Sequence, residues 1–248
     1  MPALPDLERR AQMYAALGEP LRLAIVDQLT LGDSAPGELG RALDIPTNLL
    51  AHHLRVLEEA GLISRVRSEG DRRRSYVRRR SDLPTVGALR DRDGGRATEV
   101  GAPHPRIGSA SRVVFVCTHN SARSQLAAAV WKGLSATPAA SAGTNPSGRV
   151  HPRAMAVGRR HGLRLSRTAT AHTDEVLCED DLVIAVCDNA YEELATAGPR
   201  PRLHWSIPDP VRIDTDDAFE AAYQDIADRV DRLARAVNPA DPPPSRTR

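Results

Sequence analysis

The sequence predicts two domains, a mainly helical one followed by an α/β domain built on a parallel sheet. Three observations support this prediction: helical apolar spacing in the first 60 residues, short apolar strands that alternate with helices after residue 111, and a stretch rich in Gly, Pro and Ala between them. The length of 248 residues suits two modest domains. We place the domains at residues 1–90 and 111–237, with a flexible linker at 91–110 and a disordered tail at 238–248.

Composition argues against a membrane or exported protein. No apolar run approaches the ~18 residues that a membrane helix needs, and the first residues lack the basic-then-apolar pattern of a secretory signal. The three cysteines, Cys117, Cys178 and Cys187, are too few for a disulfide framework. We therefore expect a cytoplasmic protein with no membrane partner.

The first domain is expected to hold four helices and a hairpin. The helices are predicted at residues 7–17, 20–29 and 36–43 and from residue 47 or 48, and the strands at 62–66 and 75–79. Thr47 or Asn48 would be the N-cap of the fourth helix, since both are favourable capping residues. Two short helices joined by a tight turn and followed by a hairpin predict a winged helix-turn-helix.

The hairpin is strongly basic. Residues 65–80 hold eight arginines against Glu69 and Asp71, a net charge of +6, whereas residues 1–64 carry a net charge of −4. A basic segment beside an acidic body indicates a polyanion partner, although a solvated run of charges is the alternative.

The segment ELGRALDIPTNLLAHHLRVLEEAGLISRVRSEGDRRRSYV resembles the ArsR family of bacterial metal-responsive repressors. The resemblance implies a homodimer that binds double-stranded operator DNA, with the fourth helix in the major groove and the hairpin on flanking phosphates. The residues expected to face bases are Thr47, Asn48, Ala51, His52 and Arg55, and those expected on phosphates are Arg72, Arg73 and Arg74. No cysteine precedes residue 117, and the adjacent His52 and His53 would point apart on a helix, so we expect no metal site.

The second domain opens with the apolar run RVVFVC at residues 112–117, typical of a buried parallel strand. The run leads directly into a tight loop, and the amphipathic helix QLAAAVWKGL follows. A strand, a loop and a helix aim loop N–H groups and a helix N-terminus at one point, which binds an oxyanion. We predict an oxyanion site with Cys117 as thiolate nucleophile, although a buried cysteine that merely ends a strand is the alternative. The loop residues of this site are Thr118, His119, Asn120, Ser121, Ala122 and Arg123.

Further elements complete an α/β domain. Residues 181–186 are predicted to form a second apolar strand that ends at Cys187, and Asp209 lies between two prolines in a loop. A long amphipathic helix over about 215–237 closes the domain. Strands that alternate with helices predict a three-layer domain with helices on both faces of a parallel sheet.

The phrases FVCTHNSARSQLA, SAGT, VHPRA and WSIPDP make residues 112–237 resemble the low-molecular-weight protein tyrosine phosphatases, and more closely their arsenate reductase branch. The resemblance implies Cys117 as the nucleophile and Arg123 as a bidentate anion clamp. It also implies that Asn120 holds the loop, that Ser124 hydrogen-bonds the thiolate, and that Asp209 is the general acid. Cys187 matches the first resolving cysteine of thioredoxin-linked arsenate reductases.

The chain departs from these families at four positions. Leu194 stands where the second resolving cysteine is expected, and Ala122 where some members carry a loop cysteine. Ala128 replaces a glutamate linked to a potassium site, and Val211 replaces the tyrosine that phosphatases place after Asp-Pro. Val211 argues against phosphotyrosine and so favours arsenate, whereas Leu194 makes the usual two-cysteine shuttle incomplete and leaves the regenerating thiol open. Cys187 could form a disulfide with Cys117, or a small thiol could attack the arsenic adduct directly.

We interpret the chain as a bifunctional arsenic-resistance protein, a DNA-binding repressor fused to a thiol-dependent arsenate reductase. Its partners would be operator DNA, arsenate or a phosphate-like oxyanion, and a second copy of the chain. We expect no bound cofactor but an external thiol reductant, either a low-molecular-weight thiol or a thioredoxin-like protein. Two alternatives remain: a regulator whose second domain only senses an oxyanion, and a fused protein tyrosine phosphatase.

Overall fold

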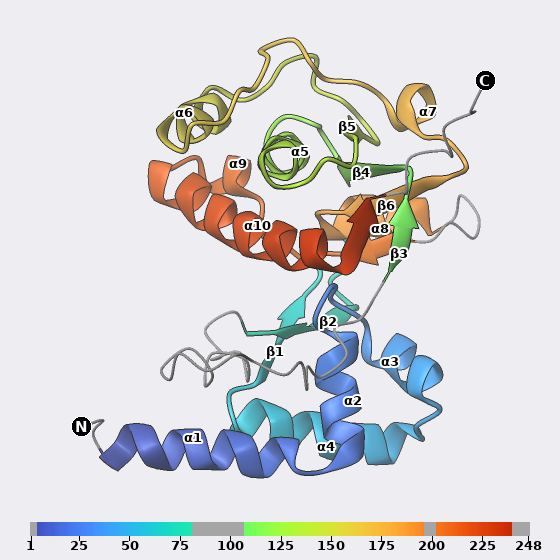
Figure 1. Cartoon of the computed structure of the whole chain (residues 1–248), viewed down its shortest axis with the longest axis vertical. Coiled ribbons are helices and arrows are strands. Elements are labelled where there is room, and N and C mark those ends of the chain that lie inside the picture. Colours follow the sequence, from blue (N-terminus) through green and yellow to red (C-terminus); the bar gives the residue numbers. More distant parts are fainter. Residues whose placement is uncertain (1–3, 81–106, 196–201, 240–248) are drawn as a thin grey trace, which may run out of the picture. The chain divides into compact units, whose positions relative to one another are not determined.

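The computed structural model describes residues 4–80, 107–195 and 202–239, and their contacts divide the chain into two units (Figure 1). Among the described residues, the first unit holds residues 4–30, 34–66 and 76–80. The second unit holds residues 107–195 and 202–239 together with two short segments from earlier in the chain, residues 31–33 and 67–75.

The first unit is mainly helical, as the sequence predicts. Its helices are α1 (Leu4–Leu17), α2 (Pro20–Gln28), α3 (Pro36–Leu43) and α4 (Thr47–Glu59). The strands β1 (Ile63–Arg67) and β2 (Ser75–Arg79) form a two-stranded sheet. A core of buried aliphatic side chains, including Ile25, Leu39, Leu54 and Leu57, joins the helices. The winged helix-turn-helix arrangement is therefore confirmed.

The start of α4 differs from the sequence prediction. Pro46, with φ −58° and ψ 143°, is the N-cap residue, and no side chain caps the helix there. Thr47 and Asn48 are the first helical residues, so neither is the expected cap. The fixed φ of proline suits a residue that precedes the first turn. As a result, both side chains remain available on the exposed start of the helix.

The second unit is built on a four-stranded parallel sheet with the order β5-β4-β6-β7 (Figure 1). The strands are β4 (Arg112–Cys117), β5 (Ala139–Gly143), β6 (Asp181–Ala185) and β7 (Arg202–His204). The helices are α5 (Arg123–Leu134), α6 (Pro152–Arg160), α7 (Thr173–Val176), α8 (Asp188–Leu194), α9 (Pro210–Ile213) and α10 (Asp216–Ala236). The predicted α/β domain with a parallel sheet is confirmed.

A short parallel pair of strands lies outside this sheet. β3 (Gly108–Ala110) pairs with β8 (Val237–Pro239), and Gly108 is in register with Val237. The sequence assigned residues 108–110 to the linker and residues 238–239 to the disordered tail, but the structure gives both segments strand geometry. Composition could not reveal this pairing, because it joins segments about 130 residues apart. The rest of the predicted linker, up to residue 106, and residues 240–248 lie outside the described residues.

Because the sheet of the second unit is parallel, the carboxyl ends of its strands lie at one edge of the sheet. β4 is buried along nearly its whole length, and its Phe115 lies between the indoles of Trp131 and Trp205, with centroid distances of 6.1 and 5.7 Å. Burial of each large apolar side chain stabilises such a core by about 1.5–3 kcal/mol. A rigid central strand therefore ends at Cys117.

No helix within the described residues is long and apolar enough to cross a membrane.

Candidate active site

The loop that follows β4 has an unusual backbone. Asn120 has a φ of 49°, in the left-handed region that non-glycine residues rarely occupy, and Ala122 has φ −142° and ψ −82° just before α5 begins at Arg123. Such strain persists only where neighbouring groups hold it, and it clusters at functional sites. The loop therefore returns the chain sharply from the end of the strand to the start of the helix.

A second loop, residues 144–151, holds the first one through its carbonyl groups. The N–H groups of Thr144, Asn145 and Ser147 donate to the carbonyls of residues 117, 118 and 119, at 3.2, 2.8 and 3.1 Å. The N–H of His151 donates to the carbonyl of residue 121 at 2.8 Å. These bonds direct four carbonyls of the loop toward residues 144–151, away from the position of an anion.

Gly143 permits this close packing. A Cβ atom at this position would lie 2.7 Å from the carbonyl oxygen of Thr118 and 3.0 Å from the Cβ of Asn120. Real Cβ atoms essentially never show the shorter of these distances. The glycine in the SAGT phrase is therefore required by the approach of β5 to the loop.

The sulfur of Cys117 is surrounded by hydrogen-bond donors. Its Sγ lies 3.1 Å from the Oγ of Ser124 and accepts the N–H of Asn120 at 3.2 Å. The Nδ2 of Asn120 donates to the Ser124 hydroxyl at 2.8 Å. With that hydroxyl oxygen occupied by the amide, its proton is available to the sulfur. The sulfur thus has two hydrogen-bond donors within reach, the kind of contact that supports a thiolate nucleophile.

Asn120 is itself held on both sides. Its Oδ1 accepts from the Nε2 of Gln125 at 3.1 Å and from the backbone N–H of Ala171 at 3.0 Å. Asn120, Ser124 and Gln125 are buried. The amide thus holds the left-handed loop, which agrees with the role that the family resemblance implies.

Arg123 is buried beside several acidic groups. Only 5% of the residue is exposed, its Nη1 donates to the carbonyl of Ile207 at 2.9 Å, and its Nη2 pairs with the Oδ2 of Asp209 at 3.2 Å. Burial lowers the pKa of Arg123, but the neighbouring Cys187, Cys117, Asp209 and Glu69 side chains raise it more, so its pKa lies above the ordinary value. The guanidinium is therefore a permanent cation next to the sulfur.

Asp209 is positioned by the prolines around it. It is the N-cap of α9, and its Oδ1 accepts the N–H of Val211 at 3.1 Å. The flanking prolines restrict the backbone of the WSIPDP loop. The other carboxylate oxygen faces Arg123, and the side chain is 14% exposed. The structure therefore brings the predicted general acid to the predicted anion clamp.

Cys187 lies at the neighbouring strand end. Val116 of β4 is in register with Ala185 of β6, so Cys117, which ends β4, and Cys187, which follows β6, lie at the carboxyl ends of adjacent parallel strands. The sulfur of Cys187 is 3.6 Å from the hydroxyl of Thr118. Burial raises the pKa of the Cys187 thiol to about 11, and the charge of Cys117 adds to this effect, whereas Arg123 opposes it.

Cys178 differs from the other two cysteines. It is exposed, and its sulfur accepts a hydrogen bond from Arg112 at 3.4 Å. It lies in the segment before β6, whereas Cys117 is the last residue of β4 and Cys187 follows the carboxyl end of β6. The structure therefore brings only two of the three thiols to the site.

Sequence reasoning missed three residues next to this site. Glu69, on the 67–75 segment of the second unit, has its Oε2 3.4 Å from the Nη1 of Arg123. Asp188 and His204 form a buried pair with a separation of 2.9 Å, and Tyr191 stacks on the imidazole at 4.2 Å. Burial raises the pKa of Asp188, but hydrogen bonds from His204 and the Glu69 N–H lower it more, so its pKa lies below the ordinary value. No spacing in the sequence points to these contacts, because they join distant segments.

The predicted DNA-binding residues lie at the surface. The five residues expected to face bases share the exposed face of α4, whereas Leu50, His53, Leu54 and Leu57 are buried on the other face. They are Thr47, Asn48, Ala51, His52 and Arg55. Arg72, Arg73 and Arg74 are also exposed, on the loop between β1 and β2. Arg73 pairs with Asp71 at 2.9 Å, and this hydrogen bond is the main reason that the pKa of Asp71 is lowered.

Metal-ligating side chains do not gather in the described part of the chain. No group of three or more His, Cys, Asp or Glu residues there has an arrangement that could hold a metal ion. His52 and His53 follow the helical geometry expected of them, with one side chain exposed and the other buried.

Comparison with known proteins matches two separate parts of the chain. Residues 112–241 match the family model of the low molecular weight phosphotyrosine protein phosphatase, and residues 17–66 match a helix-turn-helix domain model. An arsenate reductase of Halalkalibacterium halodurans is 31% identical over 123 residues, which cover 48% of this chain and 88% of that protein.

A segment of the N-terminal unit is similar to a repressor. The HTH-type transcriptional repressor SmtB of Mycobacterium tuberculosis is 37% identical over 62 residues, which cover 25% of this chain and 46% of that protein. The chain therefore spans about half the length of this relative. Among solved structures, an arsenate reductase from Archaeoglobus fulgidus is 27% identical with a TM-score of 0.43, over 50% of this chain and 98% of that one.

Proposed function

The chain belongs to the low-molecular-weight phosphotyrosine protein phosphatase family through residues 112–241, and we propose that it is a thiol-dependent arsenate reductase fused to a DNA-binding transcriptional repressor. Its N-terminal part holds an ArsR/SmtB-type helix-turn-helix domain, matched over residues 17–66. The observation that carries the enzymatic part is the pair Cys117 and Cys187, which lie at the carboxyl ends of adjacent parallel strands, with the Cys187 sulfur 3.6 Å from the hydroxyl of Thr118. A hydrolytic phosphatase needs only the first of these thiols.

The first step of the proposed reaction is attack by the Cys117 sulfur on the arsenic of arsenate. Ser124 and the N–H of Asn120 stabilise the sulfur before attack, and Arg123 neutralises the oxyanion. Loop N–H groups of residues 118–122 and the start of α5 supply further donors. Asp209 protonates the departing oxygen, which leaves as water. A covalent bond between sulfur and As(V) results.

The second step transfers two electrons to arsenic. The Cys187 sulfur attacks the Cys117 sulfur, the S–As bond breaks, and its electron pair stays on arsenic, which leaves as arsenite. The disulfide between Cys117 and Cys187 is the oxidised product. An external thiol reductant, either a small thiol or a thioredoxin-like protein, reopens it.

The order of these steps follows from the electrostatics of Cys187. Burial and the nearby Cys117 charge raise the pKa of Cys187, so its thiol is protonated in the resting protein. Cys117 has the Ser124 hydroxyl and the Asn120 N–H as hydrogen-bond donors, whereas the pKa of Cys187 is raised, so Cys117 attacks first and Cys187 second.

The DNA-binding part is supported by the exposed face of α4 and by the basic loop. Asn48 and Arg55 are residue types that hydrogen-bond base edges and phosphates, and both lie on the exposed face of the second helix of the helix-turn-helix. Arg72 and its two neighbours supply positive charge for flanking phosphates. Binding as a homodimer to a two-fold operator belongs to the same proposal.

Intact-mass analysis of reduced protein after arsenate treatment, with peptide mapping, tests the enzymatic proposal. We expect arsenite release together with a Cys117–Cys187 disulfide, and Cys187→Ser should prevent the disulfide. Cys178→Ser is the matched control and should behave like wild type. If arsenite is released while all three thiols stay free, a small external thiol and not Cys187 attacks the arsenic adduct. No arsenite release would contradict the reductase assignment.

A tyrosine phosphatase is the second candidate. The position of Asp209 beside Arg123 favours it, because a general acid at the anion clamp also serves phosphate ester hydrolysis. Hydrolysis of an aryl phosphate with no arsenite production would favour this alternative.

A further inference from the structure

Glu69 presents a carboxylate to Arg123, the predicted anion clamp, and to the backbone N–H of Asp209 beside it. Its Oε2 lies 3.4 Å from the Nη1 of Arg123, and the backbone N–H of Asp209 donates to its two carboxylate oxygens at 3.1 and 3.2 Å. A guanidinium and a backbone N–H are also the donor types that bind phosphate and related anions. Glu69 is therefore bound as an anionic ligand of the site.

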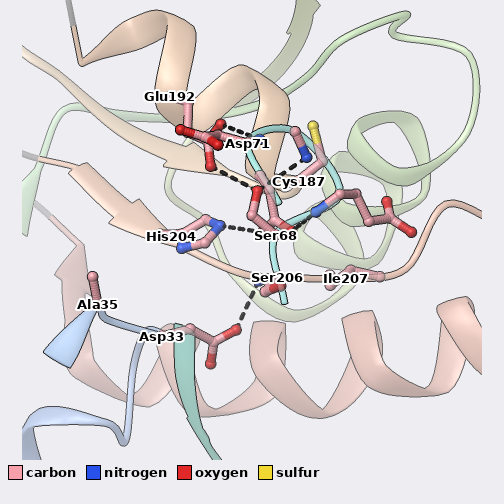
Figure 2. A network of polar contacts seen from close by, with 12 residues as sticks. Asp33, Ala35, Ser68, Asp71, Cys187, Glu192, His204, Ser206 and Ile207 are labelled. Atoms are coloured by element: carbon pink, nitrogen blue, oxygen red, sulfur yellow. Dashed lines mark hydrogen bonds and ion pairs between the residues drawn. The ribbon is translucent and has the colours of Figure 1, made fainter. Parts of the chain in front are cut away.

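The segment that carries Glu69 is anchored to the start of α8. The N–H of Glu69 donates to the Oδ2 of Asp188 at 2.8 Å, and the Ser68 hydroxyl donates to the Oε1 of Glu192 at 2.7 Å. The N–H of Asp71 donates to the other oxygen of Glu192 at 2.9 Å. Figure 2 shows Ser68 and Asp71 beside Glu192, with Cys187 close by.

Gly70 lies in close contact with side chains of α8. A Cβ atom at residue 70 would lie 2.5 Å from the Oδ1 of Asn189 and 2.6 Å from the Oε2 of Glu192. Both of these atoms are ends of side chains on α8. The segment therefore packs directly against α8, the helix that begins right after Cys187.

Arg123 cannot serve Glu69 and an oxyanion together. Its guanidinium is nearly buried and already donates to the carbonyl of Ile207 and to Asp209. An oxyanion clamped in two places needs donors that Glu69 engages. It would also bring a second negative charge beside the Glu69 carboxylate, where repulsion is only weakly screened. The two anions therefore exclude each other.

We propose that Glu69 is an intramolecular competitor of the oxyanion, so that anion binding at Arg123 releases the 67–75 segment from α8. This inference rests on the proposed oxyanion site and adds its regulation. The released segment carries Arg72, Arg73 and Arg74, the residues predicted to contact DNA phosphates. Occupancy of the site by an anion would thus change the freedom of those three side chains.

Calorimetric titration of the full-length chain with inorganic phosphate tests the competition. Glu69→Gln keeps the size of the side chain but removes its charge, and we expect it to bind phosphate about tenfold more tightly than wild type. Ser68→Ala removes one anchor and should give a smaller gain. Glu179→Gln is the matched control, since it removes the same charge from an exposed residue of the second unit, and it should leave the affinity unchanged.

Amide hydrogen exchange gives an independent measurement of release. In wild type, phosphate should speed exchange at the N–H groups of Glu69 and Asp71, because both are hydrogen-bonded to α8 side chains in the closed arrangement. In Glu69→Gln these amides should exchange faster even without phosphate.

The possible failures are distinguishable. Equal phosphate affinity of wild type and Glu69→Gln, or slower exchange of the segment with phosphate, would overturn the competition and leave the oxyanion site intact. Absence of phosphate binding to every variant would overturn the oxyanion site itself, and the competition with it.

Discussion

The Sγ atom of Cys117 lies 3.1 Å from the Oγ atom of Ser124, which joins the last residue of β4 to the second residue of α5. Because the Ser124 oxygen accepts the Asn120 amide, its proton is directed to the sulfur. The nucleophile is thus supported by the helix that follows it, and each member of this chain of hydrogen bonds can be tested.

Replacement of Ser124 by Ala should slow the attack of Cys117. A hydrogen bond to a charged group contributes about 1.5–3 kcal/mol, which corresponds to a loss of about ten- to a hundredfold in kcat. Alkylation of Cys117 by iodoacetamide at neutral pH should slow as well. Ser166→Ala changes an exposed serine and is the control. Unchanged alkylation in Ser124→Ala would contradict the role of the hydroxyl.

Replacement of Asn120 should destabilise the second unit as well as reduce activity. Asn120→Ala removes three hydrogen bonds from a buried amide and keeps a side chain at φ 49°, so we expect a loss of about 2–4 kcal/mol in the free energy of unfolding. Asn120→Gly removes the same bonds but relieves the backbone strain, so it should cost less. Urea denaturation measures both variants, and an equal cost would show that the strain contributes nothing.

The buried ion pair of Arg229 and Asp33 should be strongly coupled. Their atoms are 3.0 Å apart, both side chains are nearly inaccessible, and Asp33 also accepts the N–H of Ser206 at 2.7 Å. Figure 2 shows Asp33 beside Ser206. Arg229→Met should lower the free energy of unfolding by about 3–5 kcal/mol, because it leaves a buried carboxylate without its partner.

The double variant Asp33→Asn with Arg229→Met should recover part of that loss. A double-mutant cycle by urea denaturation gives the coupling energy directly. Additive effects of the two substitutions would contradict a direct interaction.

The thiol of Cys187 should make stability fall at high pH. Burial raises its pKa from an ordinary value of 9.0 to about 11 in the folded protein. The folded state therefore holds the Cys187 proton more tightly than the unfolded state does. The contribution of this proton to the free energy of unfolding is complete below pH 9 and is lost as the pH rises toward about 11. Two pKa units correspond to about 2–3 kcal/mol. Under reducing conditions, Cys187→Ser should show a shallower decline over this range than wild type, and parallel curves would contradict the shift.

Arg72 should contribute sequence-independent affinity for DNA. Arg72→Ala should weaken binding to a random-sequence duplex and reduce the slope of log affinity against log salt by about 1. Arg159→Ala removes an equally exposed arginine from α6 and should change neither quantity. Fluorescence anisotropy at several salt concentrations measures both. An unchanged slope in Arg72→Ala would exclude a phosphate contact.

Local patterns predicted most of the secondary structure. Helical spacing and proline positions located α2 and α3, and the apolar run before Cys117 located β4 with its bounds. The N-cap of α4 was missed, because Pro46, Thr47 and Asn48 all favour a helix start and their order does not show which residue is still extended. The β3–β8 pair was missed because strands of three residues carry too short a pattern.

The amino-acid sequence by itself determined the nucleophile loop, its oxyanion-binding character and the two-domain order, because these depend on residues close together along the chain. Eight consecutive positions hold Cys117, Asn120, Arg123 and Ser124. A strand, a loop and a helix formed by this segment bring the four side chains together without any contribution from distant residues.

Only the tertiary structure decided which distant side chains complete the site. Adjacent parallel strands bring Cys187 beside the loop, and Asp209 reaches Arg123 from a loop 86 positions further along. Glu69 reaches the same guanidinium from residues 67–75, although nothing around it in the sequence marks it as a ligand. Such contacts arise when separate segments bury charge together, and that depends on packing between segments, which no local pattern encodes.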